Sequence, residues 1–414
     1  MSGSKVYGAT LTANPSQPTG TTGTSYQWQR NTGTNGAWTN ISNATGKTYK
    51  LGTADVGHSV RVLVNTANTY YNVSQCASAA AAIGKATATA TATISGTKTI
   101  GSKLTVSVGG LPGVGTNTIA YRWQYSSDNK TWTDSNSTGA KSNVITTDTT
   151  WINKYARCVI TVSGNAYYNV NGATSAGYGP MGKASHSAPS VSISGSKVYG
   201  ATLTANVSGQ PGGTTSTTYQ WQRAISASGL YSNIANATGK TYKLAAGDMN
   251  HYLRVLVNTT NTYYNVSQGV SAGYGPIGKA SHSAPSVSVS GDKSVGATLT
   301  ANVSGQPSGT TSTTYQWQRA SSVSGSYANI SGATGKTYKT GAADANKYVR
   351  VLVNTANTYY TVSQGVSAGY GAITFEAFAV YCANDKSLNF YKIPCGKTQG
   401  FNLGMIARHR LTLR

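Results

Sequence analysis

Alternation of apolar and polar side chains is the dominant pattern in this sequence. In residues 219–223, Tyr219 and Trp221 alternate with two glutamines, so a strand would turn both aromatic rings to one face. Residues 201–207 alternate in the same way, with Leu203 among the inward positions. Both stretches predict strands with one buried face, and we expect Trp221 to be the inward anchor of its sheet.

The tryptophan-centred stretch occurs four times, at Trp28, Trp123, Trp221 and Trp317, which are 95, 98 and 96 positions apart. This period is longer than solenoid repeats of roughly 20–50 residues, and it fits autonomous sandwiches of about 100 residues. Short strands with turns every 8–12 residues or so, and no helical period, indicate an all-β protein. We therefore expect four tandem immunoglobulin-like antiparallel β-sandwiches in an elongated array, with a short partial C-terminal β tail.

The repeated landmarks predict the division of the chain. Residues 190–194 alternate as a first strand of the third repeat, and the first repeat lacks this strand, which favours a start within a longer parent or an internal start. The second repeat diverges, and Gly/Pro-rich linkers are expected at 177–183 and 273–279. The expected repeats span residues 1–84, 85–183, 184–279 and 280–372, and a partial C-terminal segment spans 373–414.

Three stretches together carry a family resemblance. Tyr-Gln-Trp-Gln-Arg at 219–223, Asn-Ala-Thr-Gly-Lys-Thr-Tyr-Lys-Leu at 236–244, and an Asp before Leu-Arg-Val-Leu-Val at 253–257 resemble the bacterial immunoglobulin-like repeats of large cell-surface proteins. The resemblance covers about 370 of the 414 residues. It implies sandwiches that project or space other modules, and related domains decorate phage particles. Residues 375–391 are expected to form a hairpin that resembles a gut bacterial surface-protein module.

The charge is strongly unbalanced but sparse. Thirty-two Lys and Arg face nine Asp and Glu, for a net charge of +23, although only 10% of residues are charged. Such a surface attracts polyanions weakly over a wide area, so glycans and anionic wall polymers are candidate partners. Clustered basic residues are lacking, which argues against a specific nucleic-acid partner. No apolar run is long enough for a membrane span, and the oligomeric state is left open.

The sequence contains no recognisable catalytic or metal-binding pattern. Four of its nine acids, Asp55, Asp148, Asp248 and Asp344, are expected at one repeated turn or capping position. Metal-ligand spacings and nucleophile motifs are missing, and the four cysteines form no disulfide framework. We predict no enzyme activity, no catalytic residues, no cofactor and no metal.

A tyrosine pair in each repeat is the candidate for ligand contact. The pairs lie near the hairpin joining the last two strands, where alternation turns one ring outward if the pair is in a strand. Exposed tyrosines beside Asn and Gln can stack on sugars; the alternative is that the rings pack over the end of the sandwich. The candidate contacts are Tyr70, Tyr71, Tyr263, Tyr264, Tyr359 and Tyr360, and the second repeat carries Tyr167 and Tyr168.

These observations predict a non-enzymatic, surface-exposed spacer or adhesin stalk. Four similar faces would raise avidity for glycans or wall polymers without a strong single site. The expected location is extracellular or at the cell surface. The alternative is a phage virion component, with immunoglobulin-like domains displayed on a tail or capsid. The chain start lacks a signal-peptide pattern, which slightly favours the virion alternative, although truncation of a secreted parent explains it equally well.

Overall fold

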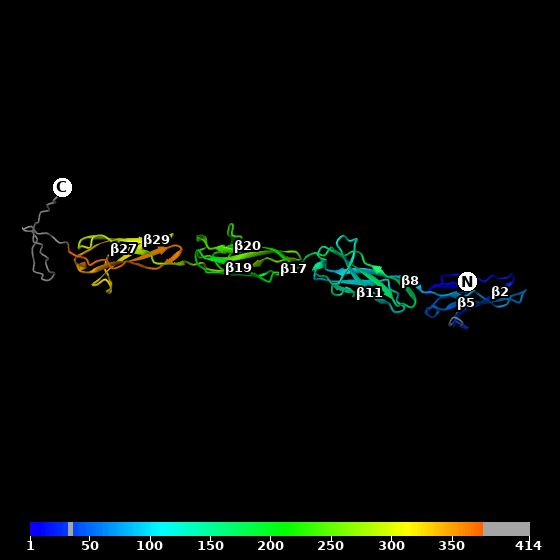
Figure 1. The fold of residues 1–414 in the computed structure, drawn as a ribbon. Helices are drawn as coiled ribbons and strands as arrows, with labels where there is room; N and C mark the ends of the chain where they lie inside the picture. The colour runs from blue at the N-terminus through cyan, green and yellow to red at the C-terminus, as the bar shows by residue number, and fades with distance from the viewer. Residues whose placement is uncertain (32–35, 376–414) are drawn as a thin grey trace, which may run out of the picture. The chain divides into compact units, whose positions relative to one another are not determined.

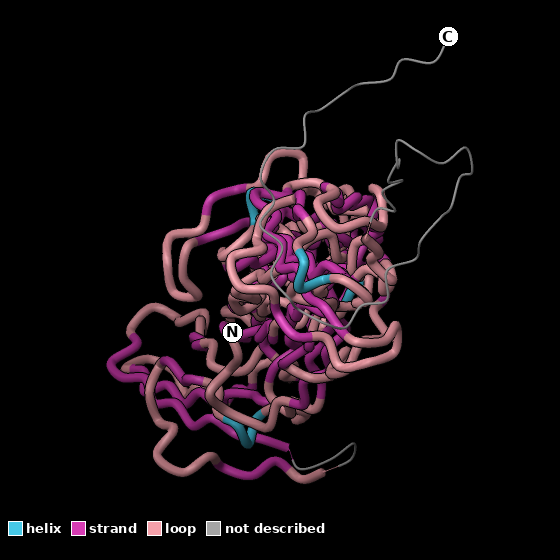
Figure 2. Tube along the Cα trace, turned by 90° about the vertical axis from the view of Figure 1, so that its left-hand side faces the viewer, coloured by secondary structure: helices cyan, strands magenta, loops and turns pink. Residues whose placement is uncertain are grey.

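A computed structural model describes residues 1–31 and 36–375, and strands joined by turns make up this part of the chain (Figures 1 and 2). Its helical segments are short 3-10 turns, drawn in cyan in Figure 2. The prediction of an all-β protein is therefore confirmed. The 3-10 turns are η1 (Thr53–Asp55), η2 (Thr149–Trp151), η3 (Ala246–Asp248) and η4 (Ala342–Asp344).

The chain divides into two compact units that do not coincide with the sequence repeats. One unit comprises Met1–Val191, Val207–Tyr219 and Leu256–Val270, and the other comprises Ser192–Asn206, Gln220–Val255 and the described residues from Ser271 onward. The first two repeats thus belong to one unit and the fourth repeat to the other. Segments of the third repeat belong to both.

In the first unit, the first repeat forms a sandwich with a reduced first sheet. The short strand β1 pairs with β4, and Ser2 makes an isolated bridge to Thr12 where the other repeats have a full first strand. The second sheet has the order β3-β2-β5-β6, with β7 also on β5. The strands are β1 (Thr10–Thr12), β2 (Thr21–Asn31), β3 (Trp38–Asn40), β4 (Thr48–Lys50), β5 (Ser59–Asn68), β6 (Cys76–Ala77) and β7 (Ala81–Ala82).

The second repeat has two complete sheets and an additional parallel pair. The orders are β13-β10-β9 and β12-β11-β14-β16, and β15 pairs in parallel with β8. The strands are β8 (Ala86–Thr89), β9 (Thr91–Gly96), β10 (Lys103–Gly109), β11 (Thr118–Ser126), β12 (Thr133–Asp134), β13 (Val144–Thr146), β14 (Tyr155–Ser163), β15 (Tyr168–Asn171) and β16 (Ala173–Thr174).

The third repeat shows the same succession of strands. Within single units, β17 pairs in parallel with β24, and β19 pairs with β22. The strands are β17 (Ala184–His186), β18 (Ser190–Ser194), β19 (Thr202–Ser208), β20 (Thr214–Ala224), β21 (Ser232–Asn233), β22 (Thr241–Lys243), β23 (Tyr252–Asn261), β24 (Tyr264–Val266) and β25 (Gly269–Val270).

The fourth repeat, in the second unit, shows the immunoglobulin-like topology most completely. Its sheets have the orders β27-β28-β31 and β30-β29-β32-β34, a Greek-key arrangement, and β26 pairs in parallel with β33. The strands are β26 (Ala280–His282), β27 (Ser286–Ser290), β28 (Thr298–Ser304), β29 (Thr310–Ala320), β30 (Ala328–Asn329), β31 (Thr337–Lys339), β32 (Tyr348–Asn357), β33 (Tyr360–Val362) and β34 (Gly365–Val366).

The repeated tryptophan is the centre of each sandwich. Trp221 is 0% exposed, as are its three equivalents, so the prediction of an inward anchor is confirmed. Each indole Nε1 donates a hydrogen bond of 2.9 Å to a backbone carbonyl, which satisfies the one polar atom of the ring. The accepting carbonyls belong to Gly46, Ser142, Gly239 and Gly335.

The segment predicted as a linker at 177–183 is part of the second sandwich, and the linker prediction is wrong there. Met181 is fully buried in the core around Trp123, and Tyr178 exchanges two backbone hydrogen bonds of 2.8 Å with Ala156. Ile373, which the expected division gives to the C-terminal segment, packs in the core of the fourth repeat. The hairpin expected at 375–391 lies almost wholly outside the described residues.

Candidate functional site: the joints between repeats

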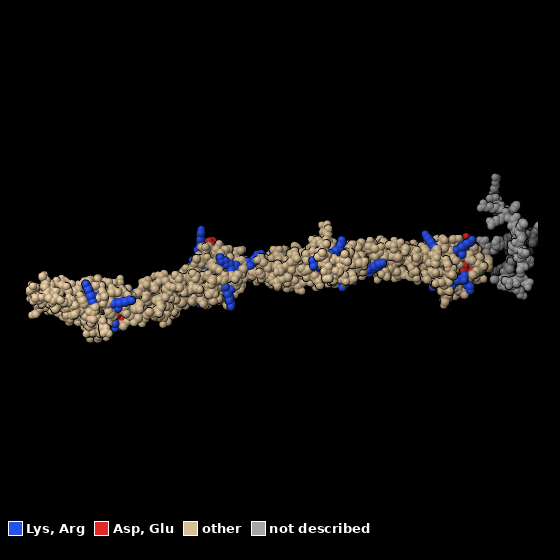
Figure 3. Space-filling view, turned by 180° about the vertical axis from the view of Figure 1, so that it is seen from behind, with Lys and Arg blue, Asp and Glu red and all other residues tan. Residues whose placement is uncertain are grey.

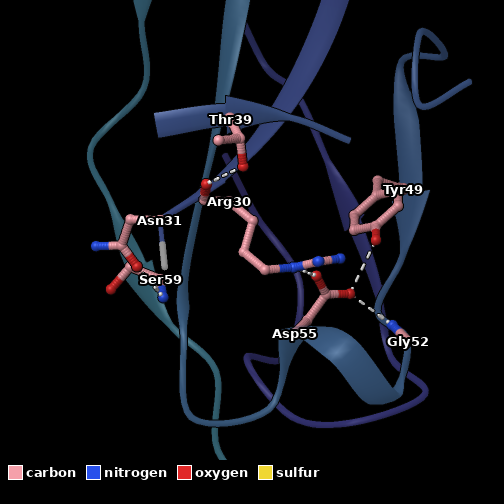
Figure 4. Close-up of polar contacts among 7 residues, drawn as sticks. All are labelled: Arg30, Asn31, Thr39, Tyr49, Gly52, Asp55 and Ser59. Atoms are coloured by element: carbon pink, nitrogen blue, oxygen red, sulfur yellow. Dashed lines mark hydrogen bonds and ion pairs between the residues drawn. The ribbon is translucent and has the colours of Figure 1, made fainter. Parts of the chain in front are cut away.

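The repeated aspartate is a structural group in three of the repeats. Asp55 is fully buried, and its Oδ1 accepts a hydrogen bond of 2.6 Å from Arg30 Nε (Figure 4). Its Oδ2 accepts from the Tyr49 hydroxyl at 2.9 Å and from the Gly52 amide at 2.6 Å, which caps the turn η1. The predicted capping role is thereby confirmed for Asp55. Asp248 accepts from Arg223, Tyr242 and the Ala245 amide. Asp344 accepts in the same way from Arg319, Tyr338 and the Gly341 amide.

The electrostatics of this cluster keep its tyrosines protonated. Burial raises the pKa of Tyr242 above its usual value, and the hydrogen bond and negative charge of Asp248 raise it further. The pKa of Tyr338 is raised for the same reasons beside Asp344. Each phenol therefore remains a hydrogen-bond donor to its carboxylate at neutral pH. A carboxylate held by three donors is suited to fixing a turn.

The second repeat fills the same place with apolar side chains, so the prediction that Asp148 repeats the turn position is wrong. Trp151, fully buried, ends η2 where Asp55 ends η1. Its ring meets Tyr125, the counterpart of Arg30, edge-on at 5.5 Å. Asp148 stands three residues earlier and accepts from the Thr150 amide at 2.8 Å.

Other candidate chemistry is sparse in the described part of the chain. There, no three His, Cys, Asp or Glu side chains gather into a set that could hold a metal ion. Cys76 is exposed and unpaired; Cys158 is buried, and burial raises the pKa of its thiol to about 11. Within residues 1–31 and 36–375 we find no helix with the length and apolarity needed to cross a membrane.

Each tyrosine pair is fixed by the asparagine that precedes it. In the fourth repeat, Asn357 Oδ1 accepts from the backbone amides of Tyr359 and Tyr360 at 2.8 and 3.0 Å. Gly309, at φ 82°, lies under the Tyr359 ring, and a Cβ there would be 2.6 Å from a ring carbon. One face of Tyr359 is thus occupied by the backbone of its own repeat. Asn68, Asn165 and Asn261 hold their pairs with the same two hydrogen bonds.

The other face of Tyr359 meets the preceding repeat. Tyr199 stacks on it with ring centroids 4.6 Å apart and planes 18° from parallel, and it meets Tyr360 edge-on at 5.5 Å. Lys279 Nζ donates a hydrogen bond of 2.5 Å to the Asn357 backbone carbonyl. Lys279 is the residue immediately before β26, the strand that pairs in parallel with β33. The aromatic stack and the lysine contact link the third repeat to the fourth, and they lie next to the strand pair β26–β33 of the fourth repeat. We call this arrangement a joint.

A joint of the same kind recurs at the two preceding boundaries, with a stacking tyrosine at the first and Ile100 in that position at the second. The ring centroid of Tyr7, in the first repeat, lies 5.6 Å from that of Tyr167 and 5.3 Å from that of Tyr168. Lys85 Nζ donates a hydrogen bond of 2.6 Å to the Asn165 backbone carbonyl. At the next boundary, Tyr263 and Tyr264 pack against the core of the second repeat, and Lys183 Nζ donates to the Asn261 carbonyl at 2.5 Å. The strand pairs β8–β15 and β17–β24 complete these two joints.

The structure thus places the candidate ligand contacts in two environments. Tyr263, Tyr264, Tyr359 and Tyr360 are half-buried within joints. Tyr70 and Tyr71 belong to the first repeat and are 72% and 63% exposed. The sequence located the pairs near the last hairpin but gave no sign of this difference, because the covering residues lie in another repeat.

Sequence reasoning missed the joint lysines and a polar cluster on the four-stranded sheet. In the third repeat, the Arg254 guanidinium lies 4.2 Å from the centre of the Tyr231 ring, and its Nε donates to Gln222 Oε1 at 2.7 Å. The sequence signal for this cluster is an arginine that recurs at the third position of the last long strand of each repeat (β5, β14, β23 and β32). The equivalent pairs are Arg61 with Trp38, Arg157 with Trp132 and Arg350 with Tyr327.

Positive charge is spread thinly over the molecule. On the face drawn in Figure 3, Lys and Arg side chains (blue) lie scattered among uncharged residues rather than gathered in one patch. This agrees with the low charged fraction of 10% and offers no concentrated polyanion site on that face.

Comparison with known proteins shows no family for this chain. No family model matches the sequence, and a search of curated proteins finds no relative. Among solved structures, the chicken CNTN1 FN1–FN3 domains are 12% identical, with a TM-score of 0.21, over 70% of this chain and 99% of that one. Three N-terminal domains of the bacteriophage RB49 Highly Immunogenic Outer Capsid protein (Hoc) are 13% identical, with a TM-score of 0.19, over 67% of this chain and 98% of that one.

Proposed function

We propose that this chain is a non-enzymatic, surface-exposed protein whose immunoglobulin-like repeats serve as a spacer or adhesin stalk. One observation carries the proposal: the same joint is built at three successive repeat boundaries. Each joint combines a lysine on a backbone carbonyl, a parallel strand pair and packing of a tyrosine pair on the preceding repeat. Neighbouring domains move relative to each other unless their interface is fixed, so a repeated fixed joint suits a protein that sets distances.

The acidic side chains support the non-enzymatic part of the proposal. Asp55, Asp248 and Asp344 are committed to turn capping and to a paired arginine and tyrosine. Asp148 caps η2, and Asp134 accepts hydrogen bonds from Gln124 and Arg122. General acid–base work requires a carboxyl group that can reach a substrate, and Asp55, Asp248 and Asp344 are fully buried.

Weak multivalent binding of glycans or wall polymers is a second candidate, favoured by the arginine–aromatic clusters. Tyr231 and its equivalents are partly exposed, and each stands beside Arg, Gln and an Asn or Asp, which are side chains that pair with sugar hydroxyls. Four copies would raise avidity. On a glycan array, Arg254→Ala together with its three equivalents should abolish retention; unchanged retention would exclude these clusters as the glycan site.

As a spacer, the protein would lie at a bacterial cell surface. A virion decoration protein would use the same fixed distances between repeats. The gene neighbourhood distinguishes the two settings: wall-anchoring genes support the first, and tail or capsid genes support the second.

Distance measurement between repeats tests the spacer function. Spin labels are placed at Lys243 and Lys339 in a background without native cysteines, and the distance distribution is recorded by pulsed electron paramagnetic resonance. We expect one narrow distribution, broadened by Tyr199→Ala combined with Lys279→Ala and unchanged by Leu230→Ala, which removes an exposed side chain away from the joint. A broad distribution in the unaltered chain would contradict the proposal.

A further inference from the structure

An arginine on the outer face of the four-stranded sheet has no carboxylate partner in three of the four repeats. In the third repeat, Arg254 alternates with buried residues of β23, so its side chain lies on the face away from the core. The one acid of this repeat, Asp248, is fully buried and paired with Arg223. Among the ion pairs that the described residues form, none includes Arg254 or its equivalents Arg61 and Arg350.

The contacts of Arg254 leave its two terminal nitrogens available to a ligand. Nε is the one guanidinium nitrogen that donates to a described residue, Gln222. Nη1 and Nη2 are accessible, because every buried side-chain nitrogen or oxygen in the described part of the chain has a hydrogen-bond partner. Two parallel N–H groups on one side of a planar guanidinium match the two oxygens of a carboxylate.

The aromatic ring beside the guanidinium is itself held in place. The Tyr231 hydroxyl donates to the Ala227 carbonyl at 3.0 Å, and a Cβ on Gly273 would be 2.3 Å from the hydroxyl oxygen. In the fourth repeat, the Tyr327 hydroxyl donates to a backbone carbonyl at 3.1 Å, and Gly369 takes the place of Gly273. Because the ring and the glutamine fix the guanidinium before a ligand arrives, binding loses little side-chain entropy.

A row of polar groups extends from the arginine to the edge of the sheet. Gln222 Nε2 donates to Asn233 Oδ1 at 2.7 Å, and Asn233 is exposed. Its NH2 group is a donor that a sugar hydroxyl can use. The strands run in the order β21-β20-β23, so Asn233 and Arg254 lie about 10 Å apart. The row therefore suits a carboxylate and a hydroxyl that are carried on one sugar chain.

We propose that the surface formed by Arg254, Tyr231 and Asn233 binds a carboxylate-bearing sugar of an acidic polysaccharide. The carboxylate accepts from Nη1 and Nη2 of Arg254, and a hydroxyl of the same sugar chain accepts from Asn233 Nδ2. This inference rests on the glycan-binding candidate above and deepens it, because it names the chemical class of the glycan. The equivalent sites are Arg61 with Trp38 and Asn40, and Arg350 with Tyr327 and Asn329.

The second repeat carries a different version of this surface. Asp134 stands in the place of Asn233 and accepts from Gln124 at 2.6 Å and from Arg122 at 3.2 Å. The hydrogen bond from Gln124 lowers the pKa of Asp134 below its usual value, so this carboxyl is charged at neutral pH. It offers no N–H to a hydroxyl and repels a second carboxylate. Acidic sugars should therefore bind the first, third and fourth repeats and avoid Arg157.

The probe is polygalacturonate, which carries a carboxylate on each sugar, and the matched control is its methyl ester, which has the same sugars without the charge. Binding of the full chain to each immobilised polymer is measured at about 0.15 M salt, where the diffuse attraction of a net charge of +23 is largely screened. We expect the acid to bind at least about tenfold more tightly than the ester, since the ester loses the charge-assisted pair of hydrogen bonds.

Substitutions that keep the net charge separate these sites from general attraction to polyanions. Lysine in place of the three site arginines retains each charge and loses the planar fork, so binding of polygalacturonate should weaken about tenfold. The control variant removes three exposed lysines from the other sheet and should change binding by less than about threefold. The first variant is Arg61→Lys, Arg254→Lys and Arg350→Lys, and the control is Lys50→Ala, Lys243→Ala and Lys339→Ala.

The second repeat allows the same site to be tested by gain of binding. Asp134→Asn combined with Arg122→Gln gives it the side chains that the third repeat has at these positions, and the net charge of the chain stays the same. The fourth site should strengthen binding of polygalacturonate at least about twofold. This result does not depend on how well the arginine variants fold.

Three results would overturn the proposal. They are equal affinity for polygalacturonate and its ester, binding that the arginine-to-lysine variant leaves unchanged, and tighter binding of polyphosphate through the same arginines, which would assign the sites to phosphate groups. If acid and ester bind equally and both are lost when the arginines are replaced by alanine, the glycan-binding candidate stands and only the carboxylate assignment fails. Lack of binding to both polymers would contradict both. The spacer test uses the joint between the third and fourth repeats and is independent of these results.

Discussion

The second and fourth repeats fill one place in the same sandwich with opposite chemistry, and they keep the same joint. In the fourth repeat, Arg319, Tyr338 and Asp344 form a buried polar cluster. In the second, Tyr125 and Trp151 pack there with ring centroids 5.5 Å apart. Yet both repeats hold their tyrosine pair with an asparagine and receive a lysine from the preceding segment.

The contrast distinguishes the side chains that stabilise a single repeat, which differ between the second and fourth repeats, from the contacts that link repeats, which both share. A buried ion pair can be exchanged for well-packed apolar side chains at little cost in stability, because desolvation offsets the attraction between the charges. The polar cluster is therefore one of two solutions to a packing problem. The lysine contact and the parallel strand pair recur at all three boundaries, whereas the stacking tyrosine of the preceding repeat recurs at two of them and is Ile100 at the middle one.

The largest expected effect concerns the feature that both repeats share. Trp317→Ala and Trp123→Ala should each lower the free energy of unfolding of their own repeat by about 3–5 kcal/mol, because each leaves a large cavity and an unpaired carbonyl. Residue-resolved hydrogen exchange under native conditions measures each repeat separately. A loss below about 1 kcal/mol in either repeat would mean that the tryptophan is not the anchor of the sandwich.

Replacing one member of the polar cluster should cost nearly as much. Asp344→Ala leaves Arg319, the Tyr338 hydroxyl and the Gly341 amide without their acceptor, and should destabilise the fourth repeat by about 3 kcal/mol. Asp148→Ala in the second repeat removes a turn cap and should cost only about 1 kcal/mol. Equal losses measured by hydrogen exchange would contradict the contrast between the two repeats.

Alkaline pH should weaken the fourth repeat through Tyr338. Its pKa is raised in the folded state, so the protonated phenol stabilises the fold fully below the unfolded pKa of about 10. This contribution is lost as pH rises through the folded pKa. Stability should therefore fall from about pH 10 upward, and Tyr338→Phe should remove this part of the pH dependence. The second repeat has Ile145 at this position and serves as the internal control. An unchanged alkaline profile in the Tyr338→Phe variant would refute the assignment.

Exchanging the complete set of side chains should have the smallest effect. Arg319→Tyr, Tyr338→Ile and Asp344→Trp together reproduce the second repeat's solution in the fourth. We expect the free energy of unfolding to change by less than about 1 kcal/mol, or to rise. A loss close to that of Asp344→Ala alone would show that the polar cluster has a role beyond filling this place.

The sequence was sufficient for the features that depend on nearby residues. Alternation around Trp221 predicted the buried strand face, and the tyrosine pairs were placed near the hairpin that joins the last two strands. Asp148 is not the equivalent aspartate, because it stands 25 residues after Trp123, whereas the capping aspartates stand 27 residues after their tryptophans (55 − 28, 248 − 221 and 344 − 317). Trp151, 28 residues after Trp123, takes that place because the second repeat has one additional residue between Trp123 and Ile145. The exposure of Tyr70 and the burial of Tyr359 could not be predicted, since the difference arises from contacts with a separate repeat.

Hydrogen exchange of three equivalent amides in the unaltered chain tests the central claim most directly. The Ser267 and Ser363 amides donate at 3.1 Å to the His186 and His282 carbonyls of the strands that follow the joint lysines, whereas Ser74, their counterpart in the first repeat, has no such strand beside it in the described part of the chain. If the strand pairs beside the joints are formed in solution, Ser267 and Ser363 exchange slowly and Ser74 exchanges at nearly the rate of an unstructured peptide. Exchange of Ser363 as fast as that of Ser74 would contradict the account.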